Sequence, residues 1–206
     1  MTAAARRHLA RDSVMRKLIR RHGPCRLEPH GRSPYETLVR AIAHQQLNGR
    51  AAETILGRFV ALFPKGRFPA PAAVLAARAT TLRRAGFSRA KVRAIKDIAR
   101  HTVKGVVPTR RACRRLSDEE MIERLTPIHG VGRWTVEMLL IFTLGRLDVL
   151  PVDDFGVREG FRHAYGRRAR PTPKALRMFG ERWMPYRSVA AWYLWRAAGD
   201  ARLKTK

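Results

Sequence analysis

A glycine-containing turn, an apolar helix and a pair of carboxylates follow one another within residues 126–156. Gly130 and Gly132 in the turn lack Cβ atoms, so the backbone there can take positive φ and closely approach another molecule. The first turn of the following helix presents unpaired N–H groups, which favour a bound phosphate. Residues 134–144 are apolar on nearly every face and predict a helix buried in the middle of the protein. We therefore expect a backbone site for an anion and a carboxylate at opposite ends of one buried helix.

The net charge of the chain indicates a polyanionic partner. Its 206 residues include 43 Lys+Arg and 16 Asp+Glu, which gives a formal charge of +27 and a pI near 11.7. Self-repulsion at this charge destabilises a compact protein, so a basic surface without a binding role is a poor explanation. Nucleic acid is the first candidate and an anionic membrane surface the second, and charge alone does not separate DNA from RNA.

The cysteines and the N-terminus indicate the cellular context. Cys25 and Cys113 are far apart without a Cys-x-x-Cys spacing, so neither a disulfide framework nor a zinc or iron–sulfur site is expected. A reducing compartment fits this pattern, and we expect a cytoplasmic, nucleoid-associated protein, or a nuclear one in a eukaryote. No apolar segment is long enough to span a membrane. Residues 1–12 are expected to form a basic arm before a helix that begins at Ser13, although their arginines also resemble a transit peptide.

Helical patterns with local start signals cover the chain. Ser33, Ser88 and Ser117 mark the starts of three helices. The last helix is expected over residues 189–198 and is expected to end at Gly199. Because alternating β-branched runs are absent, we expect an all-helical chain with short connections.

An amide-rich cluster follows the helix that starts after Ser33. Gln45, Gln46 and Asn48 offer amide donors and acceptors together, which suits a segment that reads or fills a gap in stacked bases. An ordinary solvated helix end has the same composition, and the pattern alone favours this second interpretation.

The ordered motifs resemble those of the helix-hairpin-helix/Gly-Pro-Asp (HhH-GPD) superfamily of DNA glycosylases. Within it, Gly-Arg-Trp-Thr at 132–135, Leu-Pro-x-Asp-Asp at 150–154 and the segment 181–188 are most similar to the DNA-3-methyladenine glycosylase II family. The similarity covers roughly residues 33–199. A lone Gly-x-Gly turn is weak evidence, whereas the set of landmarks in the family's order is strong.

This resemblance implies an all-α fold of two helical lobes with a central cleft that faces DNA and without a β-rich N-terminal lobe. Residues 13–206 would form the glycosylase domain, with the helix-hairpin-helix at about residues 118–144. The implied enzyme is a monofunctional DNA glycosylase that flips alkylated purines such as 3-methyladenine and 7-methylguanine out of double-stranded DNA. It hydrolyses the N-glycosidic bond and leaves an abasic site for base-excision repair. A monomer is implied, with no required cofactor but with a site for a monovalent cation, Na⁺ or K⁺, at the hairpin.

Asp153 and Asp154 stand at the start of a helical pattern, where simple N-capping would explain them both. The resemblance makes Asp154 similar to the family's catalytic aspartate, so we assign the cap to Asp153 and the chemistry to Asp154. The reverse assignment remains open. A carboxylate near a helix N-terminus stays ionised, because the helix dipole favours the anion, and it can stabilise a cationic sugar.

Trp134 and Trp195 are similar to the aromatic residues that sandwich the extruded base in this family. An electron-rich ring favours a cationic alkylated purine by roughly 0.5–2 kcal/mol. Met138, one turn after Trp134, belongs to the same expected base pocket and replaces an aromatic residue of some relatives, which points to a wider or less selective pocket. Trp134 also occupies the position of the Schiff-base lysine in bifunctional relatives, which implies that no strand is cut. Core filling is the alternative for both tryptophans, and at least one is expected to be mostly structural.

The segment Gln45–Leu47 resembles the family segment that plugs the gap left by the extruded base, with Gln46 as the first candidate and Gln45 and Leu47 beside it. The hairpin is similar to the family's site for the DNA backbone, although His129 replaces the usual proline. The expected phosphate contacts come from His129, Gly130, Val131, Gly132, Arg133 and Thr135.

Other functions fit parts of the pattern. A glycosylase for oxidised or deaminated bases would keep the chemistry and change the lesion. A non-catalytic helix-hairpin-helix module that only binds DNA would explain the hairpin, but it would not require Asp154 and the two tryptophans. An RNA-binding role explains the charge and none of the motif order.

Overall fold

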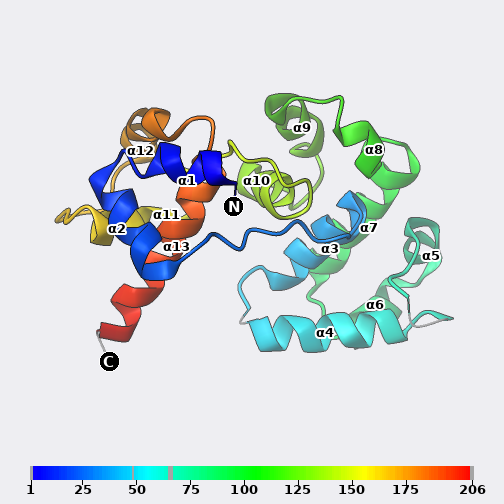
Figure 1. The fold of residues 1–206 in the computed structure, drawn as a ribbon. Coiled ribbons are helices and arrows are strands. Elements are labelled where there is room, and N and C mark those ends of the chain that lie inside the picture. Colours follow the sequence, from blue (N-terminus) through cyan, green and yellow to red (C-terminus); the bar gives the residue numbers. More distant parts are fainter. Residues whose placement is uncertain (1, 48, 65–66, 205–206) are drawn as a thin grey trace. The chain divides into compact units, whose positions relative to one another are not determined.

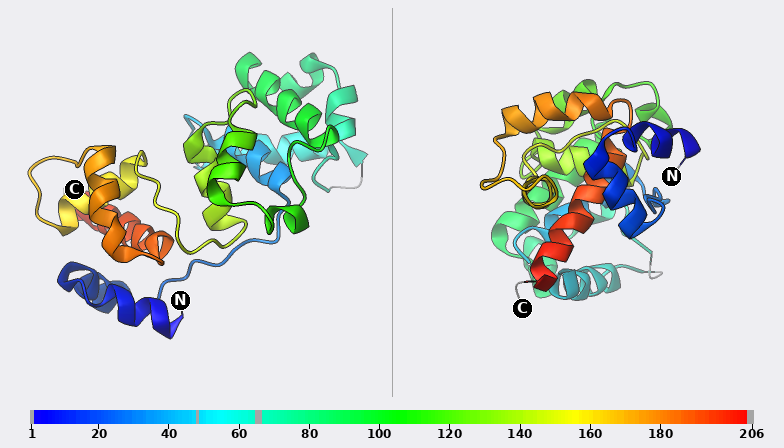
Figure 2. Two further views of the ribbon diagram at one scale, coloured as in Figure 1. Left: turned by 90° about the horizontal axis from the view of Figure 1, so that it is seen from above. Right: turned by 60° about the vertical axis from the view of Figure 1, so that its left-hand side comes forward.

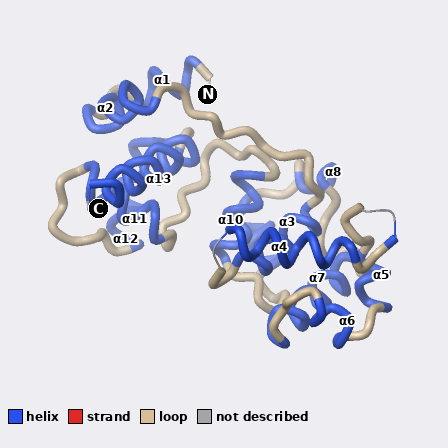
Figure 3. The backbone as a smooth tube through the Cα atoms, turned by 90° about the horizontal axis from the view of Figure 1, so that it is seen from below, coloured by secondary structure: helices blue, strands red, loops and turns tan. Residues whose placement is uncertain are grey.

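The computed structural model describes residues 2–47, 49–64 and 67–204 (Figure 1). In chain order the helices are α1 (Ala3–Leu9), α2 (Ser13–His22), α3 (Pro34–His44), α4 (Gly49–Ala61), α5 (Pro71–Ala76), α6 (Ala79–Arg84), α7 (Arg89–Val103), α8 (Arg110–Cys113), α9 (Asp118–Leu125), α10 (Arg133–Phe142), α11 (Phe155–Ala164), α12 (Pro173–Gly180), the 3-10 helix η2 (Glu181–Trp183) and α13 (Arg187–Lys204). The described backbone consists of helices and loops alone (Figure 3), which confirms the all-α expectation. None of the described helices combines the length and the apolar character that crossing a membrane demands.

The helices form two compact units. Unit 1 contains Met1–His30 and Leu140–Lys206, and unit 2 contains Gly31–Leu139, so the division falls inside α10. In unit 1 helices from the N-terminal and C-terminal parts of the sequence lie side by side, because α2 packs against α13 (Figures 1 and 2). Helix α11 packs along α13 in the same unit.

The first residues of the chain are helical rather than a loose arm. Thr2 caps α1 by accepting a hydrogen bond from Ala5 N at 3.2 Å, and Ala5 and Leu9 are buried in the core of unit 1. Asp12 then caps α2 and accepts a hydrogen bond from the Tyr165 hydroxyl at 2.7 Å. The expectation of a basic arm therefore does not fit residues 3–9, because their two apolar side chains, one turn apart, find a core to pack into.

Helix α13 continues past Gly199, where the sequence predicted its end. Asp200 forms an ion pair with Arg21 of α2 at 2.8 Å, and its carboxylate lies 3.1 Å from His22 Nε2. The last turns of α13 are thus stabilised by residues of α2. A glycine as a local end signal does not show such contacts with another helix. The prediction that Gly199 ends the helix was wrong.

Unit 2 is built around α7, against which α3 and α5 both pack. Its helices begin where local signals predicted: Ser33, Ser88 and Ser117 cap α3, α7 and α9 through their side-chain oxygens. Glu120 completes a capping box with Ser117. The capping box fixes the start of α9, the helix that precedes the hairpin turn.

Helix α10 is not buried on every face. Val136 and Leu139 are fully buried, whereas Trp134 is 41% exposed and Met138 is half-buried. Trp134 and Met138 lie one turn apart and so share a side of the helix. The prediction of a helix apolar and buried on nearly every face is therefore wrong for this side, which presents an indole to the surface.

Candidate functional site

The first group of candidate residues lies in unit 1, at the start of α11. Asp154 is the N-cap of this helix: its Oδ1 accepts a hydrogen bond from Val157 N at 2.7 Å, and the residue is only 9% exposed. Asp153 is exposed. The assignment of the cap to Asp153 was therefore wrong, because Asp154 N donates to Pro151 O in a turn that delays the start of the helix to Phe155.

Trp195 of α13 holds the same carboxylate. Its indole Nε1–H donates to Asp154 Oδ1 at 2.8 Å, so this oxygen accepts two hydrogen bonds, one from the helix backbone and one from a half-buried ring. The ring also lies 5.6 Å from that of Phe142, centroid to centroid. Two fixed donors orient the carboxylate before any substrate arrives.

Gly156 makes this close approach of the indole possible. A Cβ atom at position 156 would lie 2.8 Å from Trp195 Cδ1 and 3.2 Å from Asp154 Oδ1. Any residue other than glycine at position 156 would therefore push the Trp195 ring away from the carboxylate. Sequence reasoning did not single out this residue, and the available signal was a glycine two positions after Asp154 in an otherwise ordinary helix start.

Gly160, one turn further along α11, brings the two helices of this site together. A Cβ atom there would lie 1.8 Å from the carbonyl oxygen of Leu194, the residue before Trp195. The backbone of α13 thus occupies the space that a side chain would need. Gly156 and Gly160 share the side of α11 that faces α13.

The second group of candidate residues lies in unit 2, at the turn between α9 and α10. Gly130 has φ +83°, and an added Cβ atom would lie 2.9 Å from that of Ala94. Gly132 is different, since it lacks a positive φ and, apart from its chain neighbours, no described residue lies within 4 Å of its Cβ position. The fold requires glycine at 130, whereas the open space at 132 permits another molecule to approach the backbone.

Two side chains anchor this turn, one from the C-cap residue of α3 and one from α7. Gln45 Nε2 donates to Gly130 O at 3.1 Å, and Asp97 Oδ2 accepts from His129 N at 2.9 Å. Lys91 Nζ donates to the carbonyl oxygens of Ala43 and Gln45, each at 2.8 Å, and burial lowers the pKa of this ammonium. Sequence reasoning missed Asp97 and Lys91, because their partners are distant in the chain.

The residues of the amide cluster therefore have different environments. The Gln45 side chain is engaged with the hairpin, whereas Gln46 is exposed and has φ +58°, a left-handed conformation that is uncommon outside glycine. Leu47 beside it is 40% exposed. Asn48 lies outside the described residues. Gln46 and Leu47 are thus the members of the cluster that the fold presents outward.

Arg133 opens α10 between two carboxylates. Its guanidinium forms ion pairs with Glu119 of α9 and with Glu137, which is 4% exposed. The hydrogen bond to Glu119 raises the pKa of Arg133 above its usual value. Because its charge is compensated, Arg133 offers a phosphate mainly its backbone N–H, as does Thr135, which is buried.

The remaining candidates can be placed individually. His129 is exposed and Val131 is buried in the hairpin turn. The exposure of Trp134 argues against core filling as the reason for this residue. Trp134 and Met138 belong to unit 2 and Trp195 to unit 1. Among the described residues, no three His, Cys, Asp or Glu side chains are grouped as a metal site would require.

Comparison with known proteins gives a consistent family. The family model described as HhH-GPD superfamily base excision DNA repair protein matches residues 39–185. DNA-3-methyladenine glycosylase 1 of Schizosaccharomyces pombe is 43% identical over 182 residues, which cover 88% of this chain and 79% of that protein.

Solved structures agree with this similarity. The S. pombe 3-methyladenine DNA glycosylase in complex with abasic DNA has a TM-score of 0.86 at 41% identity. The match covers 94% of this chain and 96% of the S. pombe chain. A DNA-3-methyladenine glycosidase of Bacillus halodurans has a TM-score of 0.85 at 34% identity. The match covers 98% of this chain and 92% of that protein's chain.

Proposed function

The chain belongs to the HhH-GPD superfamily of base excision DNA repair proteins, and from this premise we propose that it is a monofunctional DNA glycosylase for alkylated purines in duplex DNA. The observation that carries the proposal is Asp154, a nearly buried carboxylate fixed at a helix N-terminus by the indole of Trp195. The name of the S. pombe relative, a DNA-3-methyladenine glycosylase, supports the substrate class. A module that only binds DNA could use the carboxylate as a helix cap, but it would not require the second hydrogen bond from the Trp195 indole.

Extrusion of the base is the first step of the proposed reaction. Removing a base from the stack costs a few kcal/mol, and the cost is lower for a damaged base that pairs poorly. An alkylated purine carries positive charge, and the exposed indole of Trp134 offers it an electron-rich face worth roughly 0.5–2 kcal/mol. We propose that Met138, on the same side of α10, contributes to the edge of this base site.

Cleavage of the glycosidic bond is the second step. As the bond from C1′ to the base nitrogen breaks, the bonding electrons leave with the purine and the sugar becomes oxocarbenium-like. Asp154 supplies the negative charge that stabilises this cation, orients a water molecule for attack on C1′ and accepts the proton that the water loses as its oxygen bonds to C1′. The products are the free base and an abasic site. Because Trp134 replaces the Schiff-base lysine of bifunctional relatives, the strand stays intact.

Duplex binding is assigned to the hairpin turn and the amide cluster. Backbone N–H groups at the start of α10 bind phosphate, and Gln46, held outward in its left-handed conformation, fills the gap left by the base. Contacts to phosphate position the protein without reading sequence. Because binding depends on contacts to charged phosphates, the affinity for duplex DNA should fall steeply as the salt concentration rises.

Gly132→Ala should weaken binding to duplex DNA by about tenfold while lowering the free energy of unfolding by no more than about 1 kcal/mol. The new methyl group meets no protein atom but stands where a phosphate would approach. Gly130→Ala is the matched control and should mainly destabilise the fold, because its φ is +83° and Ala94 is too close. Fluorescence anisotropy with a labelled duplex and urea unfolding give the two quantities. Unchanged DNA affinity in Gly132→Ala would remove the hairpin from the interface.

Trp195→Phe should slow base release by about tenfold and leave duplex affinity nearly unchanged. Phenylalanine keeps an aromatic ring but lacks the N–H that donates to Asp154 Oδ1. Single-turnover release of 3-methyladenine measures the rate. A wild-type rate in this variant would show that the hydrogen bond does not position the carboxylate.

We extend the proposal to a monovalent cation, Na⁺ or K⁺, at the backbone carbonyls of the hairpin turn. Gln45 Nε2 donates to the carbonyl of Gly130 and Val131 N donates to that of Ile128, so the remaining carbonyls of residues 126–131 would hold the ion. A cation there adds positive charge next to the phosphate and leaves the reaction at the sugar to Asp154. Replacing Na⁺ by tetramethylammonium at constant ionic strength should weaken duplex binding, and equal binding would exclude the ion.

The substrate class can be tested with end-labelled duplexes that each contain one lesion. A duplex with an alkylated purine should become cleavable only after hot alkali, which cuts abasic sites, and should stay intact without it. Duplexes with an oxidised guanine or a deaminated base serve as controls and should react much more slowly. Faster reaction of a control lesion would change the substrate class, and strand cleavage without alkali would contradict the monofunctional assignment.

A further inference from the structure

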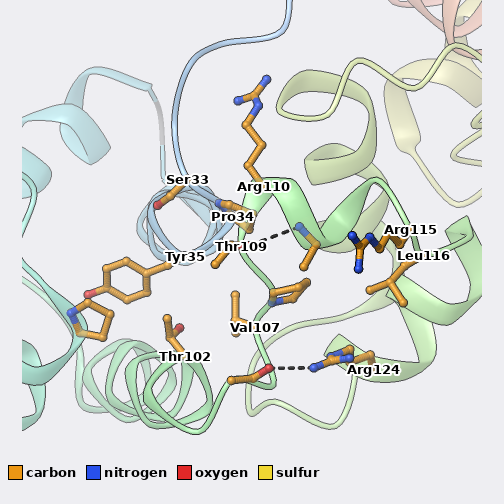
Figure 4. Close-up of a pocket in the computed structure, with 14 residues that line it drawn as sticks. Ser33, Pro34, Tyr35, Thr102, Val107, Thr109, Arg110, Arg115, Leu116 and Arg124 are labelled. Carbon is orange, nitrogen blue, oxygen red and sulfur yellow. Dashed lines mark hydrogen bonds between the residues drawn. The ribbon is translucent and has the colours of Figure 1, made fainter.

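A pocket of about 660 Å³ lies in unit 2, and it shares no residue with the hairpin turn or the amide cluster. It is formed by the start of α3, the end of α7, the loop that follows α7, and α8, with contributions from α5 and α9. Figure 4 shows Tyr35 on one side of the pocket and Arg115 with Leu116 on the other. The proposed glycosylase reaction makes no use of this pocket.

The walls of the pocket are mainly apolar. Pro34, Tyr35, Pro71, Val107, Pro108 and Leu116 contribute most of the apolar side chains. Tyr35 is 7% exposed, and its hydroxyl has no hydrogen-bond partner among the described residues. Burial raises the pKa of this hydroxyl, which therefore remains a neutral donor. The hydroxyl itself is enclosed, so the pocket meets Tyr35 as an apolar ring.

The charges around the pocket are all positive. Arg110, Arg115 and Arg124 belong to its fourteen described lining residues, and none of the fourteen is acidic. Two of the three guanidinium groups are held in place. Arg124 donates to the carbonyl oxygens of Gly105 and Val106 at 2.7 and 2.6 Å, and Arg110 donates to that of Arg32 at 3.3 Å. Arg115 is exposed at the edge.

We propose that this pocket is a docking site for an acidic peptide segment of a partner protein that carries an apolar side chain. Burying a leucine- or phenylalanine-sized side chain in the pocket contributes about 1.5–3 kcal/mol. Carboxylates beside the buried side chain pair with the arginines, whose planar guanidinium groups match them in geometry. The sugar–phosphate backbone of DNA would satisfy the charge, but it has no apolar group to fill the pocket. Charge and shape together therefore favour the peptide.

The test uses the full chain and a fluorescent synthetic peptide of Asp and Glu around a central Leu-Phe pair. Fluorescence anisotropy at physiological ionic strength measures its affinity. A second peptide, with serine in place of the Leu-Phe pair, should bind about tenfold more weakly. Arg115→Glu should also weaken the binding of the first peptide by about tenfold. Arg111→Glu is the matched control, since Arg111 is exposed on α8 but does not line the pocket, and it should change the affinity by less than about twofold.

Three results would overturn the proposal. An equal loss of peptide affinity in Arg111→Glu and Arg115→Glu would mean that the acidic peptide is attracted to the basic surface in general. Equal binding of the serine peptide would mean that the apolar pocket is not used. Displacement of the peptide by duplex or single-stranded DNA, together with weaker DNA binding in Arg115→Glu, would make the pocket a nucleic-acid surface. Base release by Arg115→Glu should equal that of the wild type, which separates this test from that of the glycosylase.

Discussion

Asp154→Asn should lower the rate of base release by about a hundredfold or more while retaining duplex binding. Asparagine keeps an oxygen that can accept from Val157 N and from the Trp195 indole, so the start of α11 should survive. It removes the negative charge that faces the cationic sugar in the transition state. Single-turnover release from a methylated duplex gives the rate, and anisotropy with the same duplex gives the affinity.

Asp153→Asn is the matched control for this variant. Asp153 is exposed and does not cap α11, so its replacement should leave the rate within about twofold of the wild type. The same loss in both variants would point to a general effect of charge near the DNA. An unchanged rate in Asp154→Asn would mean that another group stabilises the sugar.

Gly160→Ala should lower the free energy of unfolding by about 3 kcal/mol, the upper part of the range for overpacked cores. The added Cβ atom would overlap the carbonyl oxygen of Leu194 at 1.8 Å, and a helix backbone cannot rotate away as a side chain can. Relief requires α11 and α13 to separate, which also moves Trp195 away from Asp154. Urea unfolding followed by circular dichroism measures the change in stability.

Gly199→Ala provides the comparison within α13. Apart from its chain neighbours and the backbone of its own helix, nothing described lies within 4 Å of a Cβ atom at this exposed position. Alanine is favoured over glycine in a helix interior by about 1 kcal/mol, so this variant should be neutral or slightly stabilised. Equal stability of Gly160→Ala and the wild type would contradict the close packing of the two helices.

Local signals predicted much of the fold. Ser33, Ser88 and Ser117 cap the helices that the sequence assigned to them, because an N-cap depends on a side chain and a backbone N–H three residues apart. The glycine turn was also found from its pattern, and Gly130 has the positive φ expected of it. Such features involve residues within one turn of each other, which a single sequence displays directly.

Features that depend on distant residues were not predictable in this way. Trp195 contacts a carboxylate 41 positions earlier in the chain, and the space that Gly156 and Gly160 leave open has meaning only once α13 lies against α11. Both aspartates suit an N-cap, and the cap was assigned to Asp153 because the family resemblance assigned the chemistry to Asp154; the turn at Pro151 makes Asp154 the cap. Asp97 holds the hairpin from α7 without any motif of its own.

Release of free base from methylated duplex DNA by the wild-type protein decides whether the chain is a glycosylase for alkylated purines. After incubation, chromatography of the soluble fraction should show 3-methyladenine, while the DNA retains unbroken strands that carry abasic sites. Tight binding to the same duplex without any released purine would contradict the proposed function. The chain would then be a DNA-binding member of its superfamily rather than a glycosylase for alkylated bases.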